Sequence, residues 1–241
     1  MFAADPRDFA QRYRAGWPST SFLAGLENSA LHDFLTSGEL TRFRRGQALI
    51  NEGEESNDVF LLLNASVKVT ARLDDGGKAL LAIRVGGDAV GEIAALDPGT
   101  RTATVVVAGH EPLDAVRLSH DDLHELLDDW PAAAVSLTAT VSRKLRAATR
   151  RQVDMLSCTA KVGMARVVLE LAEDYGYPAE RGGTLVAVNV TQIELGSLVG
   201  VGETTAQRAL RALRREGLIA NAGRRLLVPN MAALRSATQA E

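Results

Sequence analysis

The chain has 241 residues, of which 46% are hydrophobic and 24% charged, a composition typical of a globular protein with one or two domains. Its net charge of −3 excludes a protein that is basic throughout, as a nucleic-acid coat would be. The single cysteine, Cys158, excludes an intrachain disulfide, a four-thiolate zinc site and a cluster held by several thiolates. We expect a cytoplasmic protein without a membrane partner, because residues 1–14 lack the apolar run of a signal peptide.

Positive charge is concentrated near the C-terminus. Residues 159–241 contain ten Lys and Arg against eight Asp and Glu, whereas residues 1–158 contain 17 against 22. Six arginines and one glutamate lie within residues 208–225. This pattern favours a polyanion as the partner of that end, although a solvated helix face would show the same charges.

The first half of the chain has the pattern of a β domain. Residues 1–20 are a polar N-terminal extension, and residues 22–40 have the apolar spacing of a helix. Short runs rich in Val, Leu and Ile follow, separated by glycines, as in a β-sandwich or barrel. Asp74-Asp75-Gly76-Gly77 suits a hairpin turn, because Asp and Gly tolerate positive φ. The expected strands are 48–51, 59–63, 67–72, 79–85, 103–107 and 113–118.

From Ser119 onward the spacing becomes helical. Ser119 and Asp122 have the spacing of a capping box, and Pro131 suits the first turn of a long helix, 131–157. We expect this helix to pair with a second copy, because its apolar seam has the narrow spacing of a coiled coil. Packing on the chain's own sheet is the alternative. The seam consists of Thr138, Val141, Leu145, Ala148, Gln152 and Met155.

The C-terminal part predicts two helices joined by a sharp turn. Thr191 and Glu194 form a capping box for a helix at 192–199. Gly200 permits the turn, and a second helix follows at 203–216.

A hairpin at 219–228 completes the pattern of a winged helix-turn-helix, which binds DNA in the major groove. A small packing or protein-contacting domain is the alternative. We expect Arg208 to bind guanine, Gln207 adenine and Glu203 cytosine. The expected phosphate contacts are Thr191, Thr204, Arg211, Arg224 and Arg225.

The segment 91–104 suggests an anion-binding turn. Gly91 ends a strand, and a short helix begins at Glu92, where free backbone amides can hold an anion. Arg101 offers a fork that matches a phosphate, Thr102 adds a hydroxyl, and Glu92 can accept from a ribose hydroxyl. An ordinary salt bridge between Glu92 and Arg101 is the alternative.

These segments resemble the Crp–Fnr family of bacterial transcription regulators, which joins a cyclic-nucleotide-binding domain to a winged helix-turn-helix. The resemblance extends over residues 22–229. It rests on residues 45–53 as entry strands, on 86–94 with 101–104 as the phosphate-binding cassette, and on 191–213 as the helix-turn-helix.

The resemblance implies an α+β fold in four parts. These are an N-terminal extension (1–20), a jelly-roll or double-stranded β-helix domain that binds a cyclic nucleotide (21–130), a dimerisation helix (131–157) and a winged helix-turn-helix domain (158–241).

The resemblance also implies an effector. Cyclic AMP is expected and cyclic GMP is the second candidate, with no prosthetic group and no metal. The implied ligand contacts are Gly91, Arg101 and Thr102 to the cyclic phosphate, the backbone of Ile93 and Ala94, Glu92 to the ribose 2′-hydroxyl, and Thr149 to the purine.

The sequence departs from the family pattern at three places. The family has a Thr-Ser pair where Ala148-Thr149 stands here. It has a turn glycine where Ala65 stands, although the neighbouring Asn64 tolerates the left-handed conformation. Its best-known activator has an arginine–glutamate pair where Glu203-Thr204 stands, so a different operator half-site is expected.

We therefore expect a homodimeric regulator of double-stranded DNA, controlled by a cyclic nucleotide, with RNA polymerase as a candidate second partner. The segment 155–159 is expected to be the movable hinge. One alternative is a constitutive or other-ligand-sensing regulator with a vestigial cassette. Another is a ligand-gated module that contacts protein. An enzyme is least expected, because no nucleophile–base pair or metal constellation is visible.

Two further features have a structural interpretation. His120 and His124 lie four residues apart, but we expect a solvated surface and not a metal site. Cys158 is expected to be a small buried residue, with a redox role as the alternative.

Overall fold

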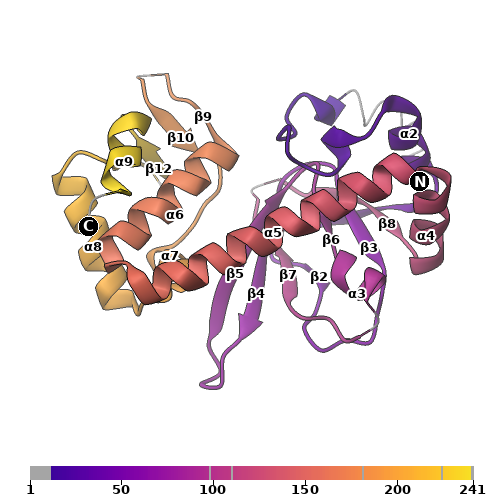
Figure 1. Cartoon of the computed structure of the whole chain (residues 1–241), viewed down its shortest axis with the longest axis horizontal. Coiled ribbons are helices and arrows are strands. Elements are labelled where there is room, and N and C mark those ends of the chain that lie inside the picture. The colour runs from indigo at the N-terminus through magenta and orange to yellow at the C-terminus, as the bar shows by residue number, and fades with distance from the viewer. Residues whose placement is uncertain (1–11, 98, 110, 181, 224, 240–241) are drawn as a thin grey trace. The chain divides into compact units, whose positions relative to one another are not determined.

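The computed structural model describes residues 12–97, 99–109, 111–180, 182–223 and 225–239. It consists of two compact units, Met1–Lys144 and Leu145–Glu241. The long helix α5 (Pro131–Ser157) contributes to both (Figure 1). The predicted α+β class, with an N-terminal β domain, a long helix and a C-terminal winged helix-turn-helix, is confirmed.

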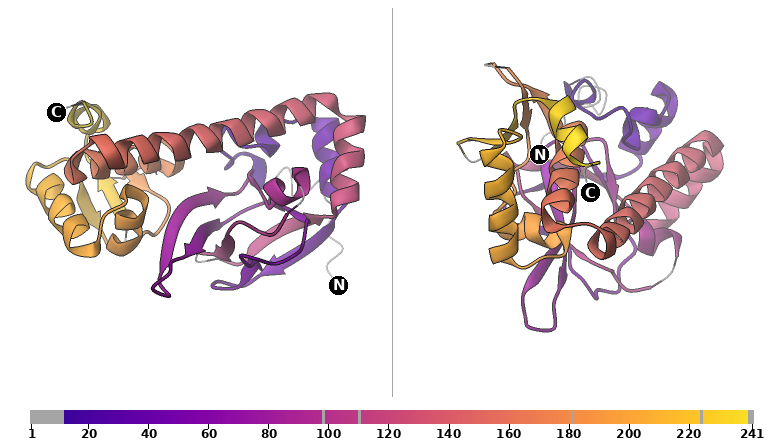
Figure 2. Two further views of the ribbon diagram at one scale, coloured as in Figure 1. Left: turned by 60° about the horizontal axis from the view of Figure 1, so that its bottom comes forward. Right: turned by 60° about the vertical axis from the view of Figure 1, so that its left-hand side comes forward.

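The strands of the first unit form two antiparallel sheets. One has the order β1-β8-β3-β6 and the other β2-β7-β4-β5. Figure 2 shows β4 and β5 as a hairpin that extends beyond the other strands of this unit. The bounds are β1 Glu39–Phe43, β2 Ala48–Ile50, β3 Val59–Leu62, β4 Ser66–Arg72, β5 Lys78–Val85, β6 Ala89–Val90, β7 Thr104–Val107 and β8 Leu113–Leu118.

Two apolar clusters hold the first unit together, and β3 contributes to both. Phe60 and Leu62 join the cluster that contains Phe43 of β1, whose ring meets Phe60 edge to face at 5.7 Å. Val59 and Leu61 join the second cluster, which lies between this sheet and the helices of the unit. Because successive residues of a strand face opposite sides, a strand buried on both faces is apolar throughout. The helices are η1 Leu23–Gly25, α2 Asn28–Thr36, α3 Glu92–Leu96 and α4 His120–Asp129, with α5.

The predicted helix at 22–40 is wrong at both ends, because residues 23–25 form the separate 3-10 helix η1 and α2 begins only at Asn28. Helix α2 ends at Thr36, and strand β1 begins at Glu39. Gly38 lies so close to β8 that a Cβ on it would be 2.5 Å from the carbonyl oxygen of Arg117. The chain therefore joins the sheet at this point, although the apolar spacing continues to Leu40.

The turn between β3 and β4 contains a left-handed residue that is not glycine. Ala65 itself has φ +54°, and Asn64 does not carry the positive φ. Asn64 instead accepts a hydrogen bond from the backbone of Asp114 and donates to the carbonyl of Pro112. These two bonds use the side chain of Asn64 to join β8 to the turn, which leaves Ala65 to adopt the unfavourable conformation.

The described part of the N-terminal extension packs on the first unit. Trp17 is buried, and its Nε1 donates to the carbonyl oxygen of Leu63 at 2.8 Å. A Cβ on Gly87 would lie 2.9 Å from the Trp17 side chain, so these residues are in close contact. Arg143 of α5 donates to the carbonyl of Thr20.

Two capping predictions are confirmed. Ser119 and Asp122 make both bonds of a capping box at the start of α4, and α5 begins at Pro131.

Among the described residues, no helix combines the length and the apolar character that crossing a membrane requires.

The second unit places helices around a small antiparallel sheet of order β11-β12-β10-β9. The predicted hairpin at 219–228 is present as β11 and β12, whereas β9 and α9 have no counterpart in the prediction. The bounds are α6 Ala160–Tyr175, β9 Gly176–Pro178, β10 Thr184–Val186, α7 Gln192–Val199, α8 Glu203–Arg215, β11 Ala220–Ala222, β12 Arg225–Val228 and α9 Met231–Ala237.

Candidate functional site: a buried arginine cassette and a helix-turn-helix

Arg101 is a buried cation whose direct hydrogen-bond partners are uncharged. Its Nε donates to Oγ of Ser56 at 2.9 Å, its Nη1 to the carbonyl of Gly91 at 2.9 Å, and its Nη2 to the carbonyl of Asp58 at 2.6 Å. Burial lowers the pKa of Arg101 below its usual value because desolvation disfavours the cation, while Asp58, Glu54 and Glu92 act in the opposite direction.

The carboxylate of Asp58 does not bond to Arg101. It accepts from Nε and Nη2 of Arg117, at 2.9 and 2.6 Å. A guanidinium has five N–H donors, and the described contacts use three of those of Arg101. Arg101 therefore has two N–H donors left, and no carboxylate is among its described hydrogen-bond acceptors, which suits it to bind an anion.

Gly91 is required by its conformation and its surroundings. It has φ +88°, immediately before α3. A Cβ at this position would lie 2.7 Å from the carbonyl oxygen of Asp58 and 2.9 Å from Nη1 of Arg101. Any other residue would be strained and would displace the arginine.

Glu92, the first residue of α3, is buried beside Gly91. Its Oε1 accepts from Nζ of Lys144 at 2.9 Å, and Lys144 also donates to the carbonyl of Ala89 at 2.8 Å. The alternative of an ordinary Glu92–Arg101 salt bridge is wrong, because the ion pair of Glu92 is with Lys144. Among the described contacts only Oε1 is engaged, so Oε2 can accept from a hydroxyl.

The structure brings some of the predicted ligand residues together. Gly91, Glu92 and Arg101 converge at the start of α3, and Ala94 is buried in that helix. The side chain of Ile93 is half exposed and Thr102 is exposed. Thr149 lies in the second unit.

Sequence reasoning missed three residues of this site: Ser56, Asp58 and Lys144. Ser56 and Asp58 lie in the connection before β3, and Lys144 is 52 residues from Glu92. No local spacing relates any of them to the cassette.

The helix-turn-helix of the second unit has the predicted caps. Thr191 and Glu194 make both bonds of the capping box at the start of α7. Gly200, in the turn before α8, has φ +76°. A Cβ on Gly200 would lie 2.3 Å from Cε of Met155, so the end of α5 packs against this turn.

Helix α8 presents a polar face. Gln207 is half-buried and is hydrogen-bonded to Glu203. The exposed predicted residues are Glu203, Thr204, Arg208 and Arg211, and the buried face consists of Ala206, Ala209, Leu210 and Leu213.

The structure shows a further partner for one predicted phosphate contact. Arg225, the first residue of β12, donates from Nη1 to the hydroxyl of Tyr177 in β9, at 2.5 Å. Tyr177 was not predicted, because β9 has no sequence signal. The hydroxyl of Thr191 accepts from the backbone of Glu194. Arg224 lies outside the described residues.

Helix α5 carries large apolar side chains that the chain itself leaves exposed. Leu145, a predicted seam residue, is 66% exposed, and Leu156 is 86% exposed. Val135 and Val153 are also exposed. Met155, another seam residue, is half exposed and also contacts Gly200.

Comparisons with known families match both units. The sequence model of the cyclic nucleotide-binding domain matches residues 40–129, and that of the Crp-like helix-turn-helix domain matches residues 164–237. A CRP-like cAMP-activated global transcriptional regulator from Mycobacterium tuberculosis is 29% identical over 205 residues, covering 85% of this chain and 90% of that protein. The chain belongs to the Crp–Fnr family of transcription regulators.

Further relatives of the regulator have the same organisation. The cAMP-activated global transcriptional regulator CRP of Escherichia coli is 22% identical over 195 residues, covering 81% of this chain and 91% of that protein. The c-di-GMP responsive global regulator CLP of Xanthomonas campestris has the same fold, with a TM-score of 0.72 at 20% identity, over 85% of this chain and all of that one. A CRP-family regulator from Thermus thermophilus has a TM-score of 0.65 at 25% identity, over 83% and 97%.

The regulator therefore has a cyclic-nucleotide-binding domain and a DNA-binding domain, and its family consists of transcription regulators and not of enzymes.

The rings of His120 and His124 lie 4.3 Å apart, and Nε2 of His124 lies 3.2 Å from the carbonyl oxygen of Ala95. Within the described residues, no cluster of three or more His, Cys, Asp or Glu could hold a metal ion. Cys158 is half-buried, not fully buried as expected.

Proposed function

We propose that the regulator is a homodimer whose affinity for a DNA operator is controlled by cyclic AMP bound at the start of α3. The main support for this ligand site is the buried guanidinium of Arg101, whose direct hydrogen-bond acceptors are a hydroxyl and two carbonyls. A buried cation is stabilised most by an anion bonded to it directly, and Arg101 has none among its described contacts. A cyclic phosphate would supply a directly bonded negative charge and take the two remaining N–H donors.

Glu92 suits the other end of the same ligand. Lys144 forms an ion pair with Oε1 of this buried carboxylate, and Oε2 is left to accept from the ribose 2′-hydroxyl. In this proposal Gly91, Thr102 and the backbone of Ile93 and Ala94 complete the phosphate contacts, and Thr149 approaches the purine. The cAMP-activated relatives support cyclic AMP, and cyclic GMP remains the second candidate.

The dimer is proposed through α5. Exposed Leu145, Val153 and Leu156 on one long helix would bury apolar area against a second copy, at about 25 cal/mol per Å². The ligand would act by favouring the state whose two α8 helices lie about 34 Å apart, one turn of B-DNA.

The proposed DNA contacts divide into two groups. Arg208, Gln207 and Glu203 read base edges. Thr191, Thr204, Arg211, Arg224 and Arg225 contact phosphates, with RNA polymerase as a candidate partner of the bound dimer.

Calorimetric titration with cyclic AMP and with cyclic GMP tests the ligand. We expect saturable binding that is lost in Arg101→Gln and retained in Arg42→Gln. The latter is a matched control, because the exposed Arg42 of β1 pairs with Asp114 of β8. Circular dichroism and thermal unfolding would show that both variants remain folded. Equal affinity in Arg101→Gln and the wild type would refute the site.

Selection of DNA duplexes from a random library, with and without the better nucleotide, tests the output. The proposal predicts a palindromic operator that is enriched only with nucleotide. The same operator enriched equally without nucleotide would instead show a constitutive regulator with a vestigial cassette.

A further inference from the structure

The C-terminal turns of α5 are fastened to α6 by two ion pairs. Arg151 pairs with Glu170, and Asp154 pairs with Arg166 at 2.5 Å between Oδ1 and Nη1. In each helix the two partners are three or four residues apart and so lie on one face. The pairs join two helices that are separated in sequence by Cys158 and Thr159 alone.

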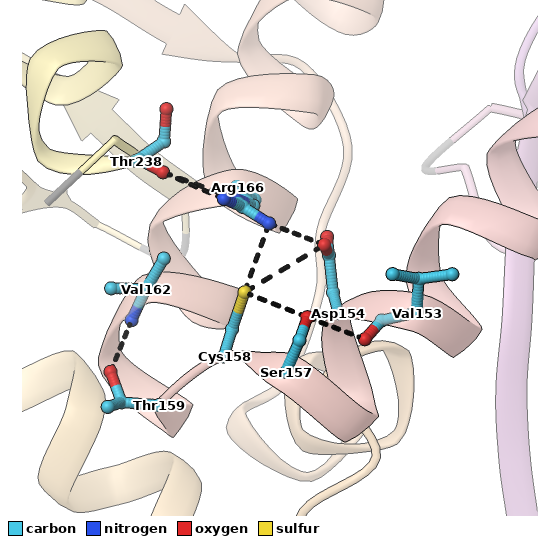
Figure 3. A network of polar contacts seen from close by, with 8 residues as sticks. All are labelled: Val153, Asp154, Ser157, Cys158, Thr159, Val162, Arg166 and Thr238. Carbon is cyan, nitrogen blue, oxygen red and sulfur yellow. Dashed lines mark hydrogen bonds and ion pairs between the residues drawn. The ribbon is translucent and has the colours of Figure 1, made fainter. Parts of the chain in front are cut away.

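Arg166 also reaches the C-terminal end of α9. Its Nε and Nη2 donate to the carbonyl oxygen of Thr238 at 3.2 and 3.1 Å, and its Nη1 lies 3.0 Å from Sγ of Cys158 (Figure 3). One guanidinium therefore connects α5, the bend after it, α6 and α9. Thr238, which caps α9, is itself buried.

The contacts of the Arg166 guanidinium fix the direction of α5 relative to α6 and α9. A single half-exposed ion pair contributes little to stability. A guanidinium is planar, however, and when its Nη1 side and its Nε–Nη2 side hold different elements, those elements cannot rotate independently. The packing of Met155 on Gly200 adds a further contact between the end of α5 and the helix-turn-helix.

We propose that Arg166 is a positioning residue for operator binding, because it fixes the direction in which α5 leaves the winged helix-turn-helix. This inference rests on the proposed function. A ligand can bias α8 through α5 only if the end of α5 is rigidly attached to the unit that carries α8. The segment 155–159, expected from the sequence to be the movable hinge, is in this proposal the clamped part of the connection.

The test compares Arg166→Met with Arg235→Met. Arg235 is the matched control, because its ion pair with Glu173 joins α9 to α6 without touching α5. Fluorescence anisotropy gives the operator affinity with and without saturating cyclic AMP. The ratio of these two affinities measures how strongly the nucleotide controls DNA binding. We expect Arg166→Met to reduce that ratio at least tenfold while nucleotide affinity changes less than twofold, and Arg235→Met to retain it. An unchanged ratio in Arg166→Met would overturn the proposal.

Charge reversal covers the case in which Arg166→Met fails to fold. We expect Arg151→Glu to lower the ratio and Arg151→Glu combined with Glu170→Arg to restore it, because the pair is re-formed with opposite polarity. A merely structural role would change thermal stability without this loss and recovery of the ratio. An Arg151→Glu variant with a wild-type ratio would count against the clamp.

Hydrogen exchange separates this proposal from the proposed function. If wild-type protein shows a ratio of one, ligand control fails, and the clamp is judged by amide exchange across residues 155–160. Exchange at least tenfold faster in Arg166→Met but not in Arg235→Met supports the clamp. Equal exchange in both variants overturns it.

Discussion

Nε2 of Gln207 donates a hydrogen bond to Oε1 of Glu203, one turn earlier on α8, over 3.0 Å. A carboxylate only accepts, so the amide nitrogen of Gln207 must face Glu203. One N–H and the carbonyl oxygen of Gln207 remain, which is the pair of groups that binds N7 and N6 of adenine. Glu203 therefore orients the side chain of Gln207, which we propose as a base contact.

This relationship predicts unequal effects of two substitutions. Gln207→Leu should abolish a preference for adenine at one operator position, costing about 1–3 kcal/mol there. Glu203→Ala should lower that preference only partly, because an exposed pair one turn apart contributes about 0.2–0.5 kcal/mol. Anisotropy with single-base operator variants measures both.

Arg211→Ala is the control for this comparison. A phosphate contact carries no sequence information, so its loss should weaken binding to every operator variant to the same extent. A Gln207→Leu protein that still discriminates adenine as the wild type does would contradict the assignment.

The buried Lys144–Glu92 pair predicts a stability effect in the first unit. Lys144→Met leaves the Glu92 carboxylate buried without its cation, and we expect a loss of about 3–5 kcal/mol in the free energy of unfolding. The double variant Lys144→Met, Glu92→Leu should recover most of this loss, since no unpaired charge remains. Urea denaturation measures both, and a double variant no more stable than the single one would contradict the pairing.

Asp88 predicts a pH dependence of stability. Burial raises the pKa of Asp88 and nearby Glu92 acts in the same direction, whereas Lys144, Arg84 and the amide of Val85 oppose the rise. Folding therefore favours protonated Asp88. Its favourable contribution is complete below about pH 4, the unfolded value, and is lost as the pH rises through the raised pKa.

The variant Asp88→Asn tests this sign. Its stability relative to the wild type should increase as the pH rises from about 4 and then level off above the raised pKa. Urea denaturation at a series of pH values provides the difference. A difference that is constant across that range would show that Asp88 does not titrate in this way.

The left-handed Ala65 predicts a stabilising substitution. An L-residue in this conformation lowers the free energy of unfolding by about 1–2 kcal/mol, and glycine would remove this strain. Glycine also makes the unfolded chain more flexible, which offsets about 0.5–1 kcal/mol of the stabilisation. Ala65→Gly should thus stabilise the protein by up to about 1 kcal/mol. Ala71→Gly, within β4, should destabilise it by about 0.5–1 kcal/mol. Thermal unfolding distinguishes them, and a lower melting temperature for Ala65→Gly would exclude strain at this turn.

Features that depend on neighbouring residues could be predicted from the sequence. The capping boxes at Ser119 and Thr191 need only residues three apart, and the hairpin at Gly76 needs only a turn that tolerates positive φ. The start of α5 at Pro131 is local in the same sense. The resemblance to one family then ordered these parts into a fold.

Features that depend on distant residues could not be predicted. The apolar spacing of α2 continues to Leu40, but contact with β8 makes that residue part of a strand. The position of Glu92 after Gly91, at the start of a short helix, could be predicted, whereas its partner Lys144 becomes visible only in the folded structure. The bonds from Arg101 to the Ser56 hydroxyl and the Asp58 carbonyl likewise follow from the path of the chain before β3.

The burial of Trp17 against Gly87 has a practical consequence for studying the molecule. The chain contains two tryptophans, Trp17 and Trp130, and both belong to the first unit, where Trp130 donates to Asp33. Intrinsic tryptophan emission therefore originates from the nucleotide-binding half alone, and the DNA-binding half is optically silent in this signal. Melting curves recorded by tryptophan emission and by far-ultraviolet circular dichroism can thus show whether the halves unfold together or in succession.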